Sequence, residues 1–174
     1  AIGSQMDTAI FESLEQNRLR RVLGRSVDPN IMEKLLANPN VDFLKGERSV
    51  LTVLYADIRR STNLAERITP EQLVGFINHY LGQMTEVILS NEGTLDKFVG
   101  DEIMALFGAP IALEDAPQRA LRSALAIHSG IAKFNGNRKG MDPIKMRIGI
   151  HTGPVVVGTL GNDLRVEFKA VGDT

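Results

Sequence analysis

The stretch Val50-Leu51-Thr52-Val53-Leu54-Tyr55-Ala56-Asp57 does most to define the fold. Between Val50 and Ala56 only Thr52 is polar. A strand this apolar is typical of one that is buried on both faces. We expect helices to cover one face, and another subunit or domain to cover the other. Asp57 then ends the strand, where the chain enters a polar loop.

A second carboxylate, Asp101, lies at a Gly-Asp turn between two further apolar runs, Leu95–Val99 and Ile103–Phe107. Short strands around such a turn indicate a β-hairpin. If this hairpin lies beside the first strand, Asp57 and Asp101 reach the same end of one sheet. Two carboxylates with open coordination positions suit Mg²⁺, which takes its other ligands from water and substrate phosphates. The alternative is that both are ordinary turn residues, since Asp is common in turns.

The remaining elements predict an α+β fold. One helix begins at Thr69-Pro70-Glu71-Gln72, which combines an N-cap, a proline at the first position and a capping-box glutamine. A second begins at Asp115-Ala116-Pro117-Gln118 and ends at Asn135-Gly136. Three β runs follow, at Ile144–His151, Val155–Leu160 and Val166–Val171. Helices on one face of a mainly antiparallel sheet account for this order.

Composition narrows the class of protein. A chain of 174 residues with 43% hydrophobic content can bury one sizeable core. Its net charge of −1 gives no general attraction to nucleic acid or to an anionic membrane, and it contains no tryptophan to stack on bases. The absence of cysteine, of an apolar span and of a signal peptide favours a cytoplasmic location without membrane contact.

The N-terminal part differs from the rest. Residues 1–27 are predicted to form a signalling or dimerisation helix, in which Met6, Ile10 and Leu14 recur at one-turn spacing. The alternative is a frayed extension derived from a tag. Residues 28–47 are predicted to hold a short helix, opened by Asp28 and Pro29, and a polar connector. The domain proper is expected over residues 48–174.

Four stretches, in this order, carry a resemblance to a known family: Val53–Thr62, Gly93–Ala105, Met146–Gly158 and Phe168–Thr174. Together they resemble the catalytic domains of the class III nucleotidyl cyclases, which are the adenylyl and guanylyl cyclases. The resemblance covers roughly residues 48–174. It implies a ferredoxin-like antiparallel sheet with helices on one face, preceded by the N-terminal helix.

The resemblance also implies roles for individual residues. Asp57 and Asp101, with the carbonyl of Ile58, would hold two Mg²⁺ or Mn²⁺ ions, and Arg147 would meet the triphosphate. The loop after the first strand would face phosphate oxygens with Arg59, Arg60, Ser61 and Thr62. For Arg147, the alternative is an ordinary strand residue whose head group reaches water.

Two lysines fall at the positions that read the purine in the family. Lys97 can only donate, which suits the acceptor N1 of adenine, whereas guanylyl cyclases place Glu there. The family usually has Asp or Thr at the second position, where this chain has Lys169. An adenylyl cyclase that makes cyclic AMP from ATP is therefore the first hypothesis. The alternatives are a guanylyl or mixed-specificity cyclase, or a non-catalytic module for nucleotide binding or dimerisation.

In the family the active site lies between two catalytic domains, so the resemblance implies a homodimer with ATP as substrate. It further implies a sensory domain upstream of residue 1. The family's motif continues beyond Gly172-Asp173-Thr174 into a helix with an Asn and an Arg that act on the substrate. We therefore expect the chain to be truncated at its C-terminus and to have negligible activity by itself.

Overall fold

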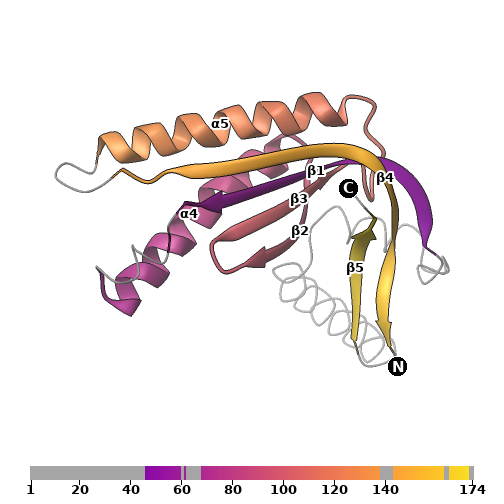
Figure 1. Ribbon diagram of the computed structural model, residues 1–174, viewed down its shortest axis with the longest axis horizontal. Coiled ribbons are helices and arrows are strands. Elements are labelled where there is room, and N and C mark those ends of the chain that lie inside the picture. The colour runs from indigo at the N-terminus through magenta and orange to yellow at the C-terminus, as the bar shows by residue number, and fades with distance from the viewer. Residues whose placement is uncertain (1–45, 60, 62–67, 138–142, 163–164, 173–174) are drawn as a thin grey trace, which may run out of the picture. The chain divides into compact units, whose positions relative to one another are not determined.

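The computed structural model describes residues 46–59, 61, 68–137, 143–162 and 165–172, and among these the side chains outside residues 159–168. The helices expected within residues 1–27 and 28–47 lie outside this part. In the described part, the order of elements is β1 (Glu47–Ile58), α4 (Pro70–Ser90), β2 (Thr94–Val99), β3 (Glu102–Phe107), α5 (Ala116–Gly136), β4 (Met146–Asn162) and β5 (Arg165–Val171) (Figure 1). No helix described here is long and apolar enough to span a membrane.

The strands form one antiparallel sheet in the order β2-β3-β1-β4-β5. The most apolar strand, β1, lies at its centre and pairs with β3 on one side and β4 on the other. Thr52, the one polar residue of the apolar run, is fully buried, and its Oγ1 lies 2.9 Å from that of Thr152 on β4. The buried position of Thr52 is therefore compatible with its hydroxyl, because that hydroxyl has a hydrogen-bond partner.

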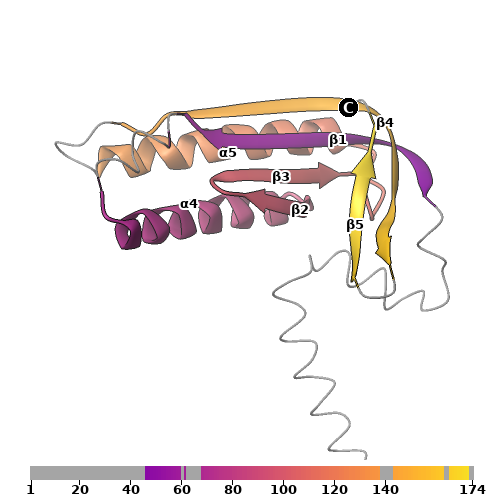
Figure 2. The same cartoon turned by 60° about the horizontal axis from the view of Figure 1, so that its bottom comes forward.

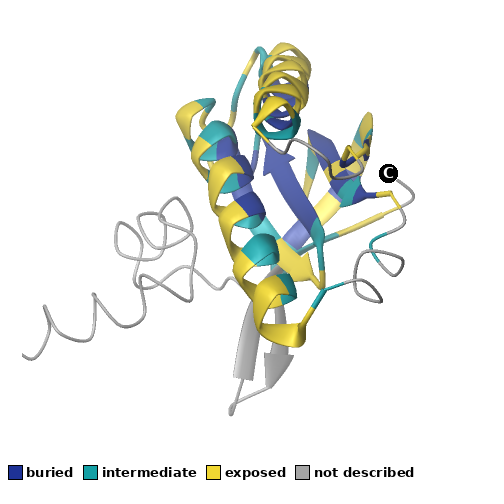
Figure 3. Ribbon diagram, turned by 90° about the vertical axis from the view of Figure 1, so that its left-hand side faces the viewer, coloured by how far each residue is buried: buried dark blue, intermediate teal, exposed yellow. Residues whose placement is uncertain are grey.

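The two faces of the sheet have different partners. Alternate residues of β1, among them Leu54, Ala56 and Ile58, pack with the buried sides of α4 and α5 in the main core. The other face is covered in part by the sheet itself, where Leu51 and Val53 pack with Val155 and Val157 of the bent strand β4. Figure 2 shows the two helices beside the sheet, and Figure 3 shows that their exposed sides are turned away from it. The α+β architecture expected from the sequence is thus confirmed.

Several predicted strand boundaries are wrong, and β3 and β5 each begin one residue earlier than expected, at Glu102 and Arg165. Strand β1 begins at Glu47, inside the expected connector, because Glu47–Ser49 pair with Val155–Val157 of β4. Strand β2 begins one residue early, at Thr94. The runs Ile144–His151 and Val155–Leu160 form one continuous strand, β4, although Gly153-Pro154 lies between them. Pro154 pairs with Val50 of β1, and pairing of β4 with β5 begins only at Val156. The proline, which has no N–H, thus lies in a part of β4 that does not pair with β5.

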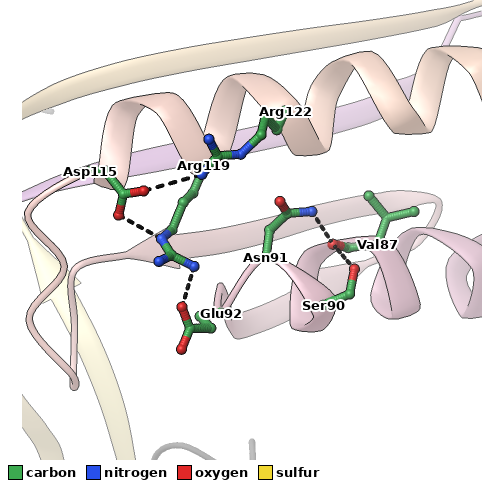
Figure 4. A network of polar contacts seen from close by, with 7 residues as sticks. All are labelled: Val87, Ser90, Asn91, Glu92, Asp115, Arg119 and Arg122. Atoms are coloured by element: carbon green, nitrogen blue, oxygen red, sulfur yellow. Dashed lines mark hydrogen bonds and ion pairs between the residues drawn. The ribbon is translucent and has the colours of Figure 1, made fainter.

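Both helices begin where the sequence predicts. The Thr69 hydroxyl accepts from the Gln72 amide, and the Gln72 side chain accepts from the Thr69 amide, which completes the capping box of α4. At the start of α5, the Asp115 side chain makes no cap hydrogen bond and instead accepts from Arg119 and Arg122 at 2.6 and 3.1 Å. Arg119 also pairs with Glu92 in the turn after α4, so this network joins the end of one helix to the start of the next (Figure 4).

Gly93, in the turn between α4 and β2, tests how tightly the core is packed. A Cβ at this position would lie 2.7 Å from both Ile88 and Phe107, whose side chains are fully buried. We expect Gly93→Ala to lower the free energy of unfolding by about 1–3 kcal/mol, as over-packed core sites do. Urea denaturation of the purified chain measures this value.

The matched control is Gly82→Ala in α4, where a Cβ would meet nothing within 4 Å. Because alanine favours a helix over glycine, this variant should be more stable by about 0.5–1 kcal/mol. Equal unfolding midpoints for the two variants would contradict the packing described for Gly93.

Candidate active site

Asp57 and Asp101 lie at one end of the sheet. Ala56 of β1 pairs with Ile103 of β3, so the last two residues of β1 lie beside the turn that holds Asp101. The pKa of the Tyr80 hydroxyl is raised, first by burial, then by the charge of Asp101 and then by that of Asp57. Both carboxylates therefore influence the same buried phenol. The chain thus brings together two carboxylates that are distant in sequence.

Arg147 lies directly across from Asp57 in the β1–β4 register, and its guanidinium donates to Asp57 Oδ2. The neighbours Met146 and Ile148 contact the helix-side core, so Arg147 lies on the opposite, open face of the sheet. Its side chain is 69% exposed. An exposed guanidinium at a strand end has the donor geometry that phosphate groups require.

The two aspartates fit a divalent metal site. Oδ2 of Asp101 is buried without a hydrogen-bond partner, an arrangement that costs free energy unless a cation or donor approaches. No cluster of three or more His, Cys, Asp or Glu side chains occurs in the part of the chain that is described. Mg²⁺ does not need one, because it commonly uses one or two carboxylates together with water and substrate phosphates.

The other phosphate-site candidates are placed in part. Ile58 is buried and ends β1, and the exposed Arg59 follows it, with its amide donating to the Lys145 carbonyl at 2.7 Å. Ser61 is half-buried. Arg60 and Thr62 lie outside the described residues. The metal and phosphate roles of all these residues stay predictions.

The two predicted base-reading lysines lie together, at a carboxylate that the sequence analysis did not select. Nζ of Lys97 is 3.6 Å and Nζ of Lys169 is 4.0 Å from Oδ2 of Asp96. The Asp96 side chain is only 1% exposed. No signal in the sequence indicated it, because regular alternation places the side chains of Asp96 and Lys97 on opposite faces of a strand.

Tyr80 of α4 was also not selected by the sequence analysis. It is 2% exposed, and its hydroxyl has no hydrogen-bond partner. Helical spacing places Tyr80 on the same face as Met84, which was the available signal.

Comparison with known proteins shows the family of the chain. Residues 45–174 match the family model for the adenylate and guanylate cyclase catalytic domain. The adenylate cyclase of Anabaena cylindrica is 36% identical over 168 residues, which are 90% of this chain. The chain spans only 32% of the length of that relative.

Two solved structures are similar in both sequence and fold. The guanylyl cyclase Cya2 is 38% identical, with a TM-score of 0.68 over 74% of this chain and 66% of the other. The adenylyl cyclase CyaB from P. aeruginosa is 34% identical, with a TM-score of 0.67 over 74% of this chain and 68% of the other. With a family model covering most of its residues, the chain belongs to the adenylate and guanylate cyclase catalytic domains, the class III nucleotidyl cyclases.

Proposed function

We propose that this chain is the catalytic domain of an adenylyl cyclase that converts ATP to 3′,5′-cyclic AMP and pyrophosphate. The observation that carries the proposal is the convergence of Asp57, Asp101 and Arg147 at one end of the sheet, in a chain that belongs to the cyclase family. In the reaction, the ribose 3′-oxygen bonds to the α-phosphorus. The bond from the α-phosphorus to the oxygen that bridges the α- and β-phosphates breaks, that oxygen leaves with pyrophosphate, and the proton of the 3′-hydroxyl is released to water.

The residues of the site divide this work. Asp57 and Asp101, with the Ile58 carbonyl, would bind two Mg²⁺ or Mn²⁺ ions. Such ions lower the pKa of a bound hydroxyl and neutralise phosphate charge. Arg147 contributes a guanidinium to the triphosphate, which it reaches by exchanging its contact with Asp57 for phosphate oxygens. No covalent intermediate with the protein is needed, so its contribution is charge neutralisation and alignment.

Lys97 supports ATP as the substrate. Its side chain is 42% exposed on β2, and an ammonium can donate to N1 of adenine but cannot accept the N1–H of guanine. GTP is the second candidate, favoured by Lys169, because a second donor near the base suits the 6-oxygen of guanine better than the 6-amino group of adenine.

We further propose that a second copy of the chain completes the site. The sheet face opposite the helices remains open around Asp57 and Arg147, and Tyr55 on this face is 39% exposed. An aromatic residue on an open face near a charged site is typical of an interface. Analytical ultracentrifugation would give the oligomeric state. A sensory domain upstream of residue 1 stays a prediction.

The direct test is turnover of the purified protein that contains this chain, with ATP or GTP and Mn²⁺. We expect cyclic AMP and pyrophosphate in equal amounts, with lower kcat/KM for GTP, measured by chromatography and mass spectrometry. A folded protein that binds Mn²⁺ and nucleotide but forms neither cyclic product would contradict a catalytic function and favour a binding module.

A further inference from the structure

The edge strand β2 contains a bulge at Asp96. Leu95 pairs with Ala105 and Lys97 pairs with Met104, so β2 uses two steps where β3 uses one, and Asp96 is the extra residue. In a regular strand, neighbouring side chains point to opposite faces. A bulge redirects one of them, and here it allows the carboxylate of Asp96 to lie 3.6 Å from the ammonium of Lys97.

The second lysine comes from the other edge of the sheet. Lys169 belongs to β5, and β5 and β2 are the two outermost strands in the sheet order. Its Nζ nevertheless lies 4.0 Å from the same oxygen of Asp96. The contact is possible because the sheet curls, which is visible in the strong bend of β4 (Figure 2).

Asp96 is therefore a buried anion between two cations. Its Oδ1 has no hydrogen-bond partner, and its Oδ2 is the atom that both lysines approach. The charge of Asp96 also affects Tyr55 on the open face of β1. The pKa of Tyr55 is raised, first by burial and then by the charges of Asp96 and Glu102. Removing one partner from such a buried group leaves the remaining charges uncompensated.

We propose that Asp96 is a positioning residue for base recognition, which orients the ammonium of Lys97 toward the purine and holds that of Lys169 away from it. The inference rests on the proposed function. Its chemical reason is the 6-position of the base. The 6-amino group of adenine is a donor and would oppose a free lysine, whereas the 6-oxygen of guanine would accept from it. By engaging Lys169, Asp96 preserves a preference for ATP despite a second donor near the base.

The test is nucleotide preference in Asp96→Asn, measured in two ways: kcat/KM for ATP and GTP with Mn²⁺, and Kd for each nucleotide by calorimetry with Ca²⁺. We expect the ATP:GTP preference to shift toward GTP on the order of tenfold, as the loss of one discriminating polar contact does. The effect should lie mainly in KM and Kd, because the base is remote from the reacting phosphorus.

The double variant Asp96→Asn/Lys169→Met separates positioning from general damage. If the released lysine causes the shift, removing its ammonium should return the preference toward that of the wild type. Asp115→Asn is the matched control, because it breaks a carboxylate–arginine network away from the base and should leave the preference unchanged. An unchanged preference in a folded Asp96→Asn, or no return in the double variant, would overturn the inference.

If Asp96→Asn does not fold, Lys169→Met alone gives the answer. A lysine that is held away from the base can be removed with less than about a twofold change in preference, whereas a lysine that contacts the base cannot.

Failure of the proposed function gives a different result. If the wild-type protein binds nucleotide without turnover, the ratio of its Kd values for ATP and GTP still tests the role of Asp96. A wild-type protein that binds neither nucleotide contradicts the proposed function itself.

Discussion

Asp101→Asn is expected to reduce metal-dependent cyclic nucleotide formation by roughly 10²–10⁴-fold, because a bound metal contributes several kcal/mol of transition-state stabilisation. The amide keeps the size of the side chain but loses the negative charge that a divalent cation requires. The loss should appear in kcat as well as kcat/KM, since the neutralised charge develops during the reaction. Product formation with Mn²⁺ measures it in the protein that contains this chain.

The same variant has an opposite expectation for stability. Oδ2 of Asp101 is buried without a donor, so the metal-free protein should lose no stability, and can gain some, when the carboxylate is replaced. Mn²⁺ should raise the melting temperature of the wild type but not of Asp101→Asn, because only a bound ligand stabilises the folded state. Asp115→Asn should keep both turnover and the Mn²⁺ effect. Full activity of a folded Asp101→Asn would exclude this residue from the metal site.

The second large effect is expected for Lys97→Glu, which should lower the ATP:GTP ratio of kcat/KM by about 10² or more. Glutamate cannot donate to N1 of adenine, and it can accept the N1–H of guanine. Sites that hydrogen-bond a base edge reject the wrong partner strongly, because their buried polar groups are then left unpaired.

The structure limits how complete this switch can be. A glutamate at position 97 would lie beside the buried carboxylate of Asp96, with Lys169 as their neighbouring cation. The new carboxylate would therefore interact in part with Lys169 inside the protein, instead of only accepting from the N1–H of guanine. Thermal unfolding of Lys97→Glu checks that the fold is retained. An ATP:GTP ratio equal to that of the wild type would show that Lys97 does not contact the base.

Local patterns in the sequence predicted most of the fold. The apolar run around Leu54 became the central strand, and the capping box at Thr69 began a helix, because both depend on neighbouring residues. The length of β4 was not predicted, since Gly153-Pro154 ends most strands. That local preference is overridden by pairing with β1, which contacts β4 along the whole length of β1 although the two segments are far apart in sequence.

In the candidate site, too, local patterns predicted some features, and contacts between distant segments determined the others. The positions of Asp57 and Asp101 at one sheet end followed from the hairpin and the end of the apolar run. The contact of Lys169 with Asp96 could not be predicted, because it depends on a one-residue bulge and on the curl of the whole sheet. Strand periodicity places Asp96 and Lys97 on opposite faces and therefore gives no indication of the contact that accompanies the bulge.

The central place of β1 also has a consequence for the order of folding. Its partners all follow it in the chain, and the Asp57–Arg147 contact joins residues 90 positions apart. At ribosomal rates of roughly 5–20 residues per second, β1 would wait about 5–20 s for the last of its partner strands to be synthesised. During that time β1 can pair with β3 once Phe107 has been synthesised, but its other edge has no partner until β4 follows. Nascent chains that stop before β4 should therefore depend on chaperones, and the sheet end that holds the candidate site should be among the last parts of the domain to form.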